Sequence, residues 1–130
     1  MNTCIFCKII SREIPADIVY EDKNFLAFLD INPTQKGHIL LMPKSHYRWV
    51  QDIPDDLTQE SALLQKKIMN SLTANIGCDY ILIAVEGLQV EHAHTHLIPS
   101  YFDKKNADWH HVTYDPGEIA KYASKIRSVL

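Results

Sequence analysis

The sequence predicts a mainly antiparallel β-sheet that is covered by one long helix and joined by a second helix near the C-terminus. Three observations predict this fold. Short apolar runs come in two pairs, and each pair is separated by too few residues for a parallel crossover. A long segment between the pairs has apolar residues at every fourth position, as on the buried face of a helix. A shorter periodic segment follows a helix-capping signal near the end of the chain.

The first pair of apolar runs predicts a hairpin. Residues 18–20 and 25–29 lie on either side of the polar turn 21–24. The next run, residues 38–42, ends at Pro43 and has apolar side chains at both alternating positions. A strand with that pattern is buried on both faces, so we expect it at the centre of the sheet.

The second pair predicts another hairpin, because residues 80–85 and 92–98 are separated by a short loop. Successive side chains of a strand point to opposite faces. Three histidines at positions 92, 94 and 96 are therefore expected on one face of the second strand.

Two helices complete the expected fold. The long one is predicted over residues 59–76, with Thr58 as its N-cap and Gly77 in the left-handed conformation that ends many helices. At the end of the chain, Asp115 and Glu118 have the spacing of a capping box. The C-terminal helix is expected to pack on the sheet through its apolar face.

Length and composition predict one domain over residues 1–130. The net charge is −3 and no dense block of Lys and Arg occurs, so we expect no nucleic-acid partner. The start of the chain lacks a basic segment followed by an apolar core, and no apolar run has the length of a membrane span. We therefore expect a cytoplasmic protein that does not bind a membrane.

The histidines at positions 92, 94 and 96 leave three alternatives open. They could form a polar strand face without catalytic duty. They could bind a catalytic zinc ion, as His-x-His pairs do. In the third alternative the central His94 attacks a phosphorus atom and a neighbouring histidine assists proton movement.

The histidine run resembles the motif of the histidine triad (HIT) superfamily, in which three histidines alternate with apolar residues. Four other blocks of the chain are similar to the family in the same order: residues 4–10, 13–15, 28–33 and 36–46. The resemblance implies an α+β fold with a five-stranded antiparallel sheet, usually a two-fold dimer. It also implies hydrolysis or transfer at the α-phosphorus of nucleoside phosphoramidates or dinucleoside polyphosphates.

The resemblance also implies roles for single residues. His94 matches the family nucleophile, which forms a nucleotidyl-histidine intermediate, and His96 matches the histidine that contacts the phosphate. Asp30 is similar to the acid that accepts hydrogen bonds from the ribose hydroxyls. The expected base pocket is formed by three apolar neighbours: Phe28, Leu29 and Ile31.

Cys4 and Cys7 form a Cys-x-x-Cys pair, which needs two further ligands to complete a tetrahedral zinc site. By resemblance to bacterial family members, His46 and His92 are the expected partners in a structural site. A reduced pair without metal and a redox pair are the alternatives, although a redox pair is typical of a βαβ pattern that this chain lacks.

The chain departs from the family pattern near the second hairpin. Val85 stands where many members have Asn, and the loop from Gly87 to Glu91 is short. Gln89 is expected to supply the missing amide donor. These departures keep a second function open, a zinc-stabilised nucleotide-binding or interaction protein with weak or no catalysis.

Two other groups of histidines carry weaker signals. His38 is expected to make a structural hydrogen bond. Residues 109–111, Trp-His-His, are expected to form an exposed loop that one tryptophan anchors.

Overall fold

The computed structural model describes residues 3–104 and 110–127. Its elements in chain order are α1 (Ile5–Ile10), β1 (Ile18–Glu21), β2 (Phe25–Leu29), β3 (Ile39–Pro43), the short 3-10 helix η1 (Val50–Asp52), α2 (Asp55–Asn75), β4 (Tyr80–Ala84), β5 (Thr95–Ser100) and α3 (Glu118–Arg127). In the described ranges, no helix is long and apolar enough to cross a membrane.

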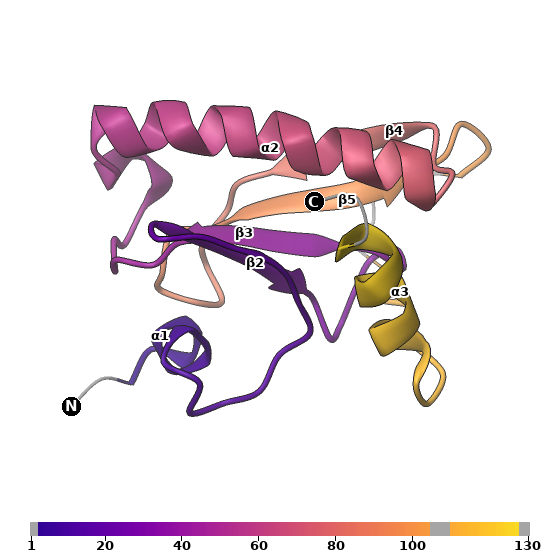
Figure 1. Cartoon of the computed structure of the whole chain (residues 1–130), viewed down its shortest axis with the longest axis horizontal. Coiled ribbons are helices and arrows are strands. Elements are labelled where there is room, and N and C mark those ends of the chain that lie inside the picture. The colour runs from indigo at the N-terminus through magenta and orange to yellow at the C-terminus, as the bar shows by residue number, and fades with distance from the viewer. Residues whose placement is uncertain (1–2, 105–109, 128–130) are drawn as a thin grey trace.

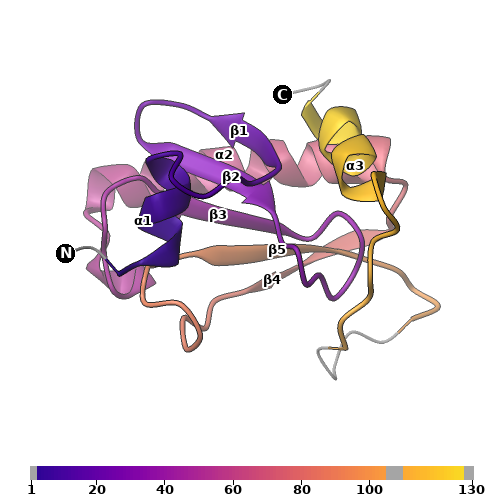
Figure 2. The ribbon, with the colours of Figure 1, turned by 90° about the horizontal axis from the view of Figure 1, so that it is seen from below.

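The five strands form one sheet in the order β1-β2-β3-β5-β4, and every neighbouring pair is antiparallel (Figure 2). Both predicted hairpins are present, and β3 lies at the centre as its apolar pattern predicted. The expected α+β class with a five-stranded antiparallel sheet is therefore confirmed. His96 pairs with Leu40 of β3 and with Ala84 of β4, which places its backbone well inside the sheet.

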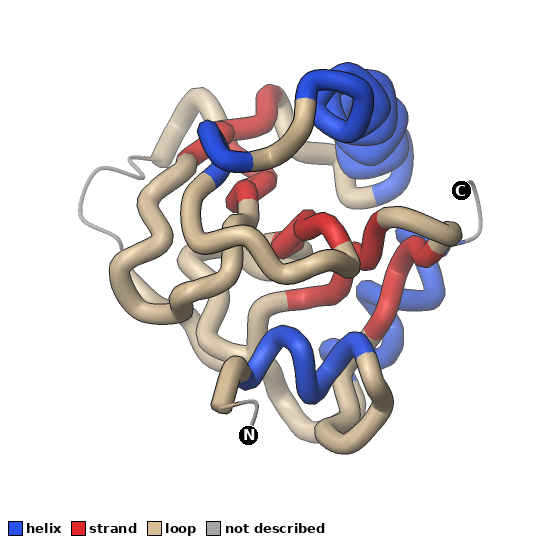
Figure 3. The backbone as a smooth tube through the Cα atoms, turned by 90° about the vertical axis from the view of Figure 1, so that its left-hand side faces the viewer, coloured by secondary structure: helices blue, strands red, loops and turns tan. Residues whose placement is uncertain are grey.

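The sheet separates two helical layers (Figures 1 and 3). α2 lies along one face with α3 near its end, and α1 lies on the opposite side. The central strands supply both cores because alternate side chains point to opposite faces. One core packs with α2 and α3 and includes Ala27, Leu29, Ile39 and Leu41. The other packs with α1 and includes Leu26, Phe28, Leu40 and Met42.

The predicted start of the long helix is wrong. α2 begins at Asp55, its N-cap is Pro54, and no side chain caps it. Thr58, the predicted N-cap, lies in the first turn, where its hydroxyl donates to the carbonyl oxygens of Ile53 and Pro54. Asp55 and Asp56 place negative charge at this helix end, which favours the helix without a capping hydroxyl. The predicted end is confirmed, since Gly77 follows the helix with φ of 77°.

The expectation that three histidines share one strand face is also wrong. β5 begins at Thr95, so His92 and His94 lie in the segment before the strand. The N–H of Ala93 donates to the carbonyl of Tyr47, 2.7 Å away, instead of joining the sheet. The segment is held by this loop contact, and the chain enters the sheet where Thr95 pairs with Leu41. The three imidazoles are consequently free to point in different directions.

Candidate functional site

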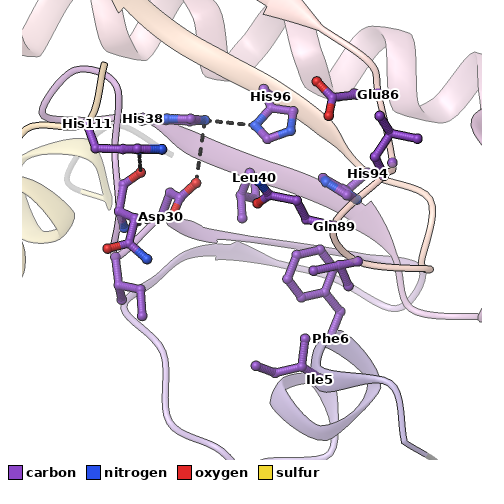
Figure 4. Close-up of a pocket in the computed structure, with 15 residues that line it drawn as sticks. Ile5, Phe6, Asp30, His38, Leu40, Glu86, Gln89, His94, His96 and His111 are labelled. Carbon is purple, nitrogen blue, oxygen red and sulfur yellow. Dashed lines mark hydrogen bonds and ion pairs between the residues drawn. The ribbon is translucent and has the colours of Figure 1, made fainter. Parts of the chain in front are cut away.

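A cavity of about 420 Å³ opens between α1, the end of β2, the loop after β4 and the start of β5 (Figure 4). Its lining combines histidines, two carboxylates and an apolar wall: Ile5, Phe6, Asp30, Ile31, Asn32, His38, Leu40, Glu86, Gly87, Leu88, Gln89, Val90, His94, His96 and His111. No Lys or Arg belongs to the lining over the described ranges. The cavity therefore offers imidazoles, amides and two carboxylates, without fixed positive charge from Lys or Arg.

His94 is held as a neutral ring with a defined tautomer. Its Nδ1 lies 2.6 Å from the carbonyl oxygen of His92. Because a carbonyl oxygen can only accept, Nδ1 carries the proton and Nε2 carries the lone pair. Burial lowers the pKa of His94, although the bond to His92 and the carboxylates of Asp30 and Glu86 oppose this shift. The result is an imidazole nitrogen with a lone pair at the cavity.

His96 is held in the opposite tautomer through His38. The backbone N–H of Thr34 donates to Nδ1 of His38 over 3.1 Å, so this nitrogen is unprotonated. The proton of neutral His38 is then on Nε2, which donates to Nδ1 of His96 over 2.9 Å. Nε2 of His96 consequently carries a proton. The cavity thus contains one imidazole with a lone pair and another with an N–H, and their ring centroids are 5.0 Å apart.

Burial keeps both members of this pair neutral. It lowers the pKa of His38 to about 3 and that of His96 to about 4. His38 makes the structural hydrogen bond that the sequence predicted, but the structure also places it in the cavity lining.

Asp30 lies at the other end of the cavity from His94 (Figure 4). One carboxylate oxygen accepts from the N–H of Asn32 over 2.9 Å, and the other is 3.8 Å from Nε2 of His38. Burial raises the pKa of Asp30, whereas the hydrogen bond from Asn32 lowers it. The second carboxylate oxygen faces the cavity histidines and has lone pairs for further donors.

Asp30, His38 and His96 place three donor atoms within 4.8 Å of one another, a separation that could suit a metal ion. A metal ion requires a lone pair on each ligand. The N–H of Thr34 fixes the proton of His38 on Nε2, the atom that faces the other two groups. We therefore interpret these residues as a hydrogen-bonded group rather than a metal site.

The apolar wall differs from the one expected from the sequence. Ile31 lines the cavity and is 74% exposed, but Phe28 and Leu29 are buried and do not belong to the lining. Phe28 packs on Phe6, with ring centroids 5.5 Å apart, and Leu29 faces the core under α2. Ile5, Phe6 and Leu40 line the cavity but were not predicted from the sequence. A signal was available for two of them, since Ile5 and Phe6 lie between the cysteines that were expected to join His92.

A second cluster lies beside the cavity and combines the four predicted metal ligands, Cys4, Cys7, His46 and His92, with ligand atoms within 4.8 Å of one another. Nδ1 of His92 is 3.5 Å from each sulfur, and Nδ1 of His46 is 3.3 Å from Sγ of Cys7. Tetrahedral zinc with ordinary bond lengths would place sulfur and nitrogen ligands about 3.5 Å apart. These four residues could therefore hold a metal ion.

The tautomer of His92 supports this assignment. Its Nε2 lies 2.8 Å from the carbonyl oxygen of Pro43, so Nε2 carries the proton and donates. The lone pair is then on Nδ1, which faces the sulfurs. A metal-binding histidine commonly donates its second N–H to such an acceptor.

The two clusters share structural parts. The side chain of His92 faces the cysteines while its carbonyl holds the ring of His94. Phe6, between the two cysteines in sequence, contacts His94 edge-on with centroids 4.9 Å apart. A change in the position of α1 or His92 would therefore alter the packing or the hydrogen bond that orients the ring of His94.

Known proteins are similar to this chain in sequence and in fold. The HIT domain family matches residues 11–103. An uncharacterized HIT-like protein of Methanocaldococcus jannaschii is 48% identical over 103 residues, which cover 75% of this chain and 79% of that protein. An adenosine 5'-monophosphoramidase of Saccharomyces cerevisiae is 40% identical over 104 residues, covering 78% of this chain and 65% of the yeast protein.

A solved structure of a member of the same family has a similar fold. The crystal structure of a Zn-bound histidine triad family protein from Mycobacterium smegmatis has a TM-score of 0.86 at 29% identity, covering 98% of this chain and 92% of that one. The family match spans most of the chain and includes the residues from Asp30 to His96 that line the cavity. This chain belongs to the HIT domain family.

Proposed function

We propose that this protein is a nucleotide hydrolase or transferase that acts at the α-phosphorus of nucleoside phosphoramidates or dinucleoside polyphosphates. The observation that carries the proposal is the pair of opposite tautomers at His94 and His96. A lone pair for attack and an N–H for a phosphate oxygen lie side by side in one cavity. The yeast relative, an adenosine 5'-monophosphoramidase, supports the choice of a phosphoramidate.

In the proposed first step, Nε2 of His94 attacks the α-phosphorus in line with the leaving group. The phosphorus–Nε2 bond forms as the phosphorus–nitrogen bond of the substrate breaks. The leaving nitrogen takes up one proton from solvent, so that a neutral amine is released. The ring of His94 then carries positive charge, which its Nδ1–H shares with the carbonyl of His92. The Nε2–H of His96 donates to a phosphate oxygen and stabilises its charge.

In the second step, water attacks the same phosphorus and releases a proton to solvent. The phosphorus–Nε2 bond breaks, its electron pair returns to His94, and a nucleoside monophosphate leaves. An alcohol or phosphate acceptor in place of water would give transfer instead of hydrolysis. Neither step requires a change in the tautomer of His96.

The remaining cavity residues are proposed to bind the nucleotide. Asp30 accepts a hydrogen bond from a ribose hydroxyl, since its second oxygen faces the cavity. Ile31 and the apolar side chains of α1 form the wall for the base, and Gln89 supplies an amide toward the phosphate. Phe28 supports this wall from behind through its contact with Phe6, whereas Leu29 belongs to the core on the other face of the sheet.

We also propose that the four-residue cluster is a structural zinc site. Zinc bound there would cross-link Cys4 and Cys7 to His46 and His92, which belong to distant parts of the chain. The chain's own residues then hold α1 against the sheet and fix the carbonyl that orients His94.

A zinc-stabilised nucleotide-binding protein without efficient catalysis is the second candidate. The observation that favours it is Val85, which is 54% exposed and offers no polar group where many family members have Asn. This candidate predicts that nucleoside monophosphates bind while phosphoramidates remain intact.

Turnover by a matched set of variants separates the two candidates. Wild type, His94→Ala and His110→Ala would be assayed with adenosine 5'-phosphoramidate and with diadenosine polyphosphates. We expect hydrolysis by wild type and His110→Ala, and a loss of about a thousand-fold or more in kcat for His94→Ala. Hydrolysis by His94→Ala at the wild-type rate would overturn the proposed mechanism. Binding without hydrolysis by wild type would establish the second candidate.

A further inference from the structure

Residues 110–111 are exposed and lie in a loop, as the sequence predicted, and the expected anchoring Trp109 is outside the described residues. His111 lies at the Asp30 end of the cavity (Figure 4). Two hydrogen bonds fix it there. Nδ1 of His111 donates to the carbonyl of Asn32 over 2.7 Å, and the N–H of Val112 donates to the carbonyl of Pro33 over 2.8 Å. The two acceptors lie two and three residues after Asp30 in the chain. The segment before α3 is therefore bound to the loop that carries Asp30.

The bond to Asn32 also determines which atom His111 offers to a ligand. A carbonyl oxygen only accepts, so Nδ1 carries a proton. In the neutral ring Nε2 then carries a lone pair, which can accept a hydrogen bond. Asp30 lines the same cavity, and Figure 4 shows His111 and Asp30 at the same end of it.

We propose that His111 is a specificity-determining residue that reads the ribose diol together with Asp30. The inference rests on the nucleotide function proposed above. Each sugar hydroxyl donates one proton, so a vicinal diol needs two acceptors, and the carboxylate of Asp30 and Nε2 of His111 supply them at one end of the cavity. A deoxyribose would leave one acceptor without its donor, and a site built to bind a hydroxyl discriminates against the analogue that lacks it.

Binding measurements with a functional-group cycle test this inference without requiring turnover. AMP, 2'-deoxy-AMP and 3'-deoxy-AMP would be titrated calorimetrically into wild type, His111→Ala, Asp30→Asn and the control His110→Ala. Wild type and the control are expected to bind AMP more tightly than either deoxy analogue, by roughly three- to ten-fold for one net hydrogen bond. His111→Ala is expected to lose the discrimination against one deoxy analogue and keep the other. Circular dichroism would verify that each variant is folded.

The outcomes separate this inference from the function on which it rests. If His111→Ala keeps both discriminations, or weakens all three nucleotides equally, the proposed role of His111 is wrong. In that case the amide of Asn32, which also lines the cavity, is the better candidate for the second contact. If wild type binds none of the three nucleotides, the proposed function itself is overturned, and this inference with it.

Discussion

At the scale of single residues, the backbone gives chemically identical imidazoles different tasks. His92 donates from Nε2 to Pro43 and keeps a lone pair on Nδ1 for the cysteine cluster. His94 donates from Nδ1 to the carbonyl of His92 and keeps its lone pair on Nε2. His38 accepts at Nδ1 from the N–H of Thr34, and its Nε2–H donates to Nδ1 of His96. Three backbone contacts therefore determine which ring nitrogens carry a lone pair and which carry a proton.

The sequence could predict which histidines belong to the candidate site, but it could not predict their tautomers or the groups that they face. Strand alternation predicted that positions 92, 94 and 96 share one face. This prediction is wrong because the segment before Thr95 forms a hydrogen bond to Tyr47 instead of pairing with β3. The groups that set the tautomers include the carbonyl of Pro43, which accepts from His92 and is distant from it in sequence, and the backbone N–H of Thr34, which donates to His38 within a turn. Period-two patterns contain no information about such contacts.

Burial of His38 predicts a pH dependence of stability. Its pKa falls from 6.5 to about 3 on folding, so between these values the unfolded chain binds a proton that the folded protein does not. The free energy of unfolding should therefore decrease as pH falls from 6.5 toward 3, by up to about 1.4 kcal/mol per pH unit from this group.

Urea unfolding of wild type, His38→Gln and the control His110→Gln at several pH values from 7 to 4.5 would measure this contribution. We expect a shallower decrease in His38→Gln than in wild type, because glutamine does not titrate. Parallel curves for wild type and His38→Gln would contradict the assignment of a neutral, buried His38.

At the scale of secondary-structure elements, α1 depends on the cysteine cluster. A six-residue helix is too short to be stable by itself. The thiol of Cys4 accepts from the N–H of Cys7 at its N-terminal end, and Phe6 and Ile9 pack on the sheet. The core under α2 contains no residue of α1, so the sheet can remain folded when α1 is released.

Metal removal is expected to loosen α1 selectively. In Cys7→Ser, or after treatment with a strong chelator, bound metal should be lost and the amides of residues 5–10 should exchange at least about ten-fold faster, while those of β3 stay protected. Metal analysis would measure the bound metal, and mass spectrometry would measure the amide exchange rates. Cys78→Ala is the control, because Cys78 belongs to the other core. Unchanged exchange in α1 after complete loss of metal would contradict the structural role.

The strands were more predictable than the helix ends. Short gaps require hairpins, and a run that is apolar at both alternating positions requires a central strand, so the β-sheet followed from local rules. α2 begins four residues before the predicted range, at Asp55, because Pro54 and two aspartates replace the expected hydroxyl cap. Helix starts without a side-chain cap have a weaker sequence signal.

At the scale of the whole molecule, the two edges of the sheet differ. α3 lies beside β1, and the guanidinium of Arg127 donates to the carbonyl of Ile18 over 2.7 Å. β4, at the other edge, exposes Tyr80 and Ile83, and Val85 follows it with more than half of its surface exposed. An open apolar edge strand is a pairing surface that proteins usually cover. We expect a second copy of this chain to cover it, in line with the dimer that the family resemblance implies.

Substitution at this edge tests the expected dimer. Light scattering coupled to size exclusion should give twice the monomer mass for wild type and the monomer mass for Ile83→Lys, since a buried lysine would oppose association. Ile5→Lys, an exposed position on α1, should remain dimeric. Monomeric wild type at micromolar concentration would contradict the expectation.

Detection of the covalent intermediate tests the central claim most directly. Wild type would be mixed with adenosine 5'-phosphoramidate, quenched within milliseconds under conditions that preserve phosphorus–nitrogen bonds, and analysed by intact and peptide mass spectrometry. We predict an added adenylyl group on the peptide that contains His94, absent from His94→Ala and present in His110→Ala. Turnover by wild type with no adduct at any time, or with an adduct on another residue, would contradict the account.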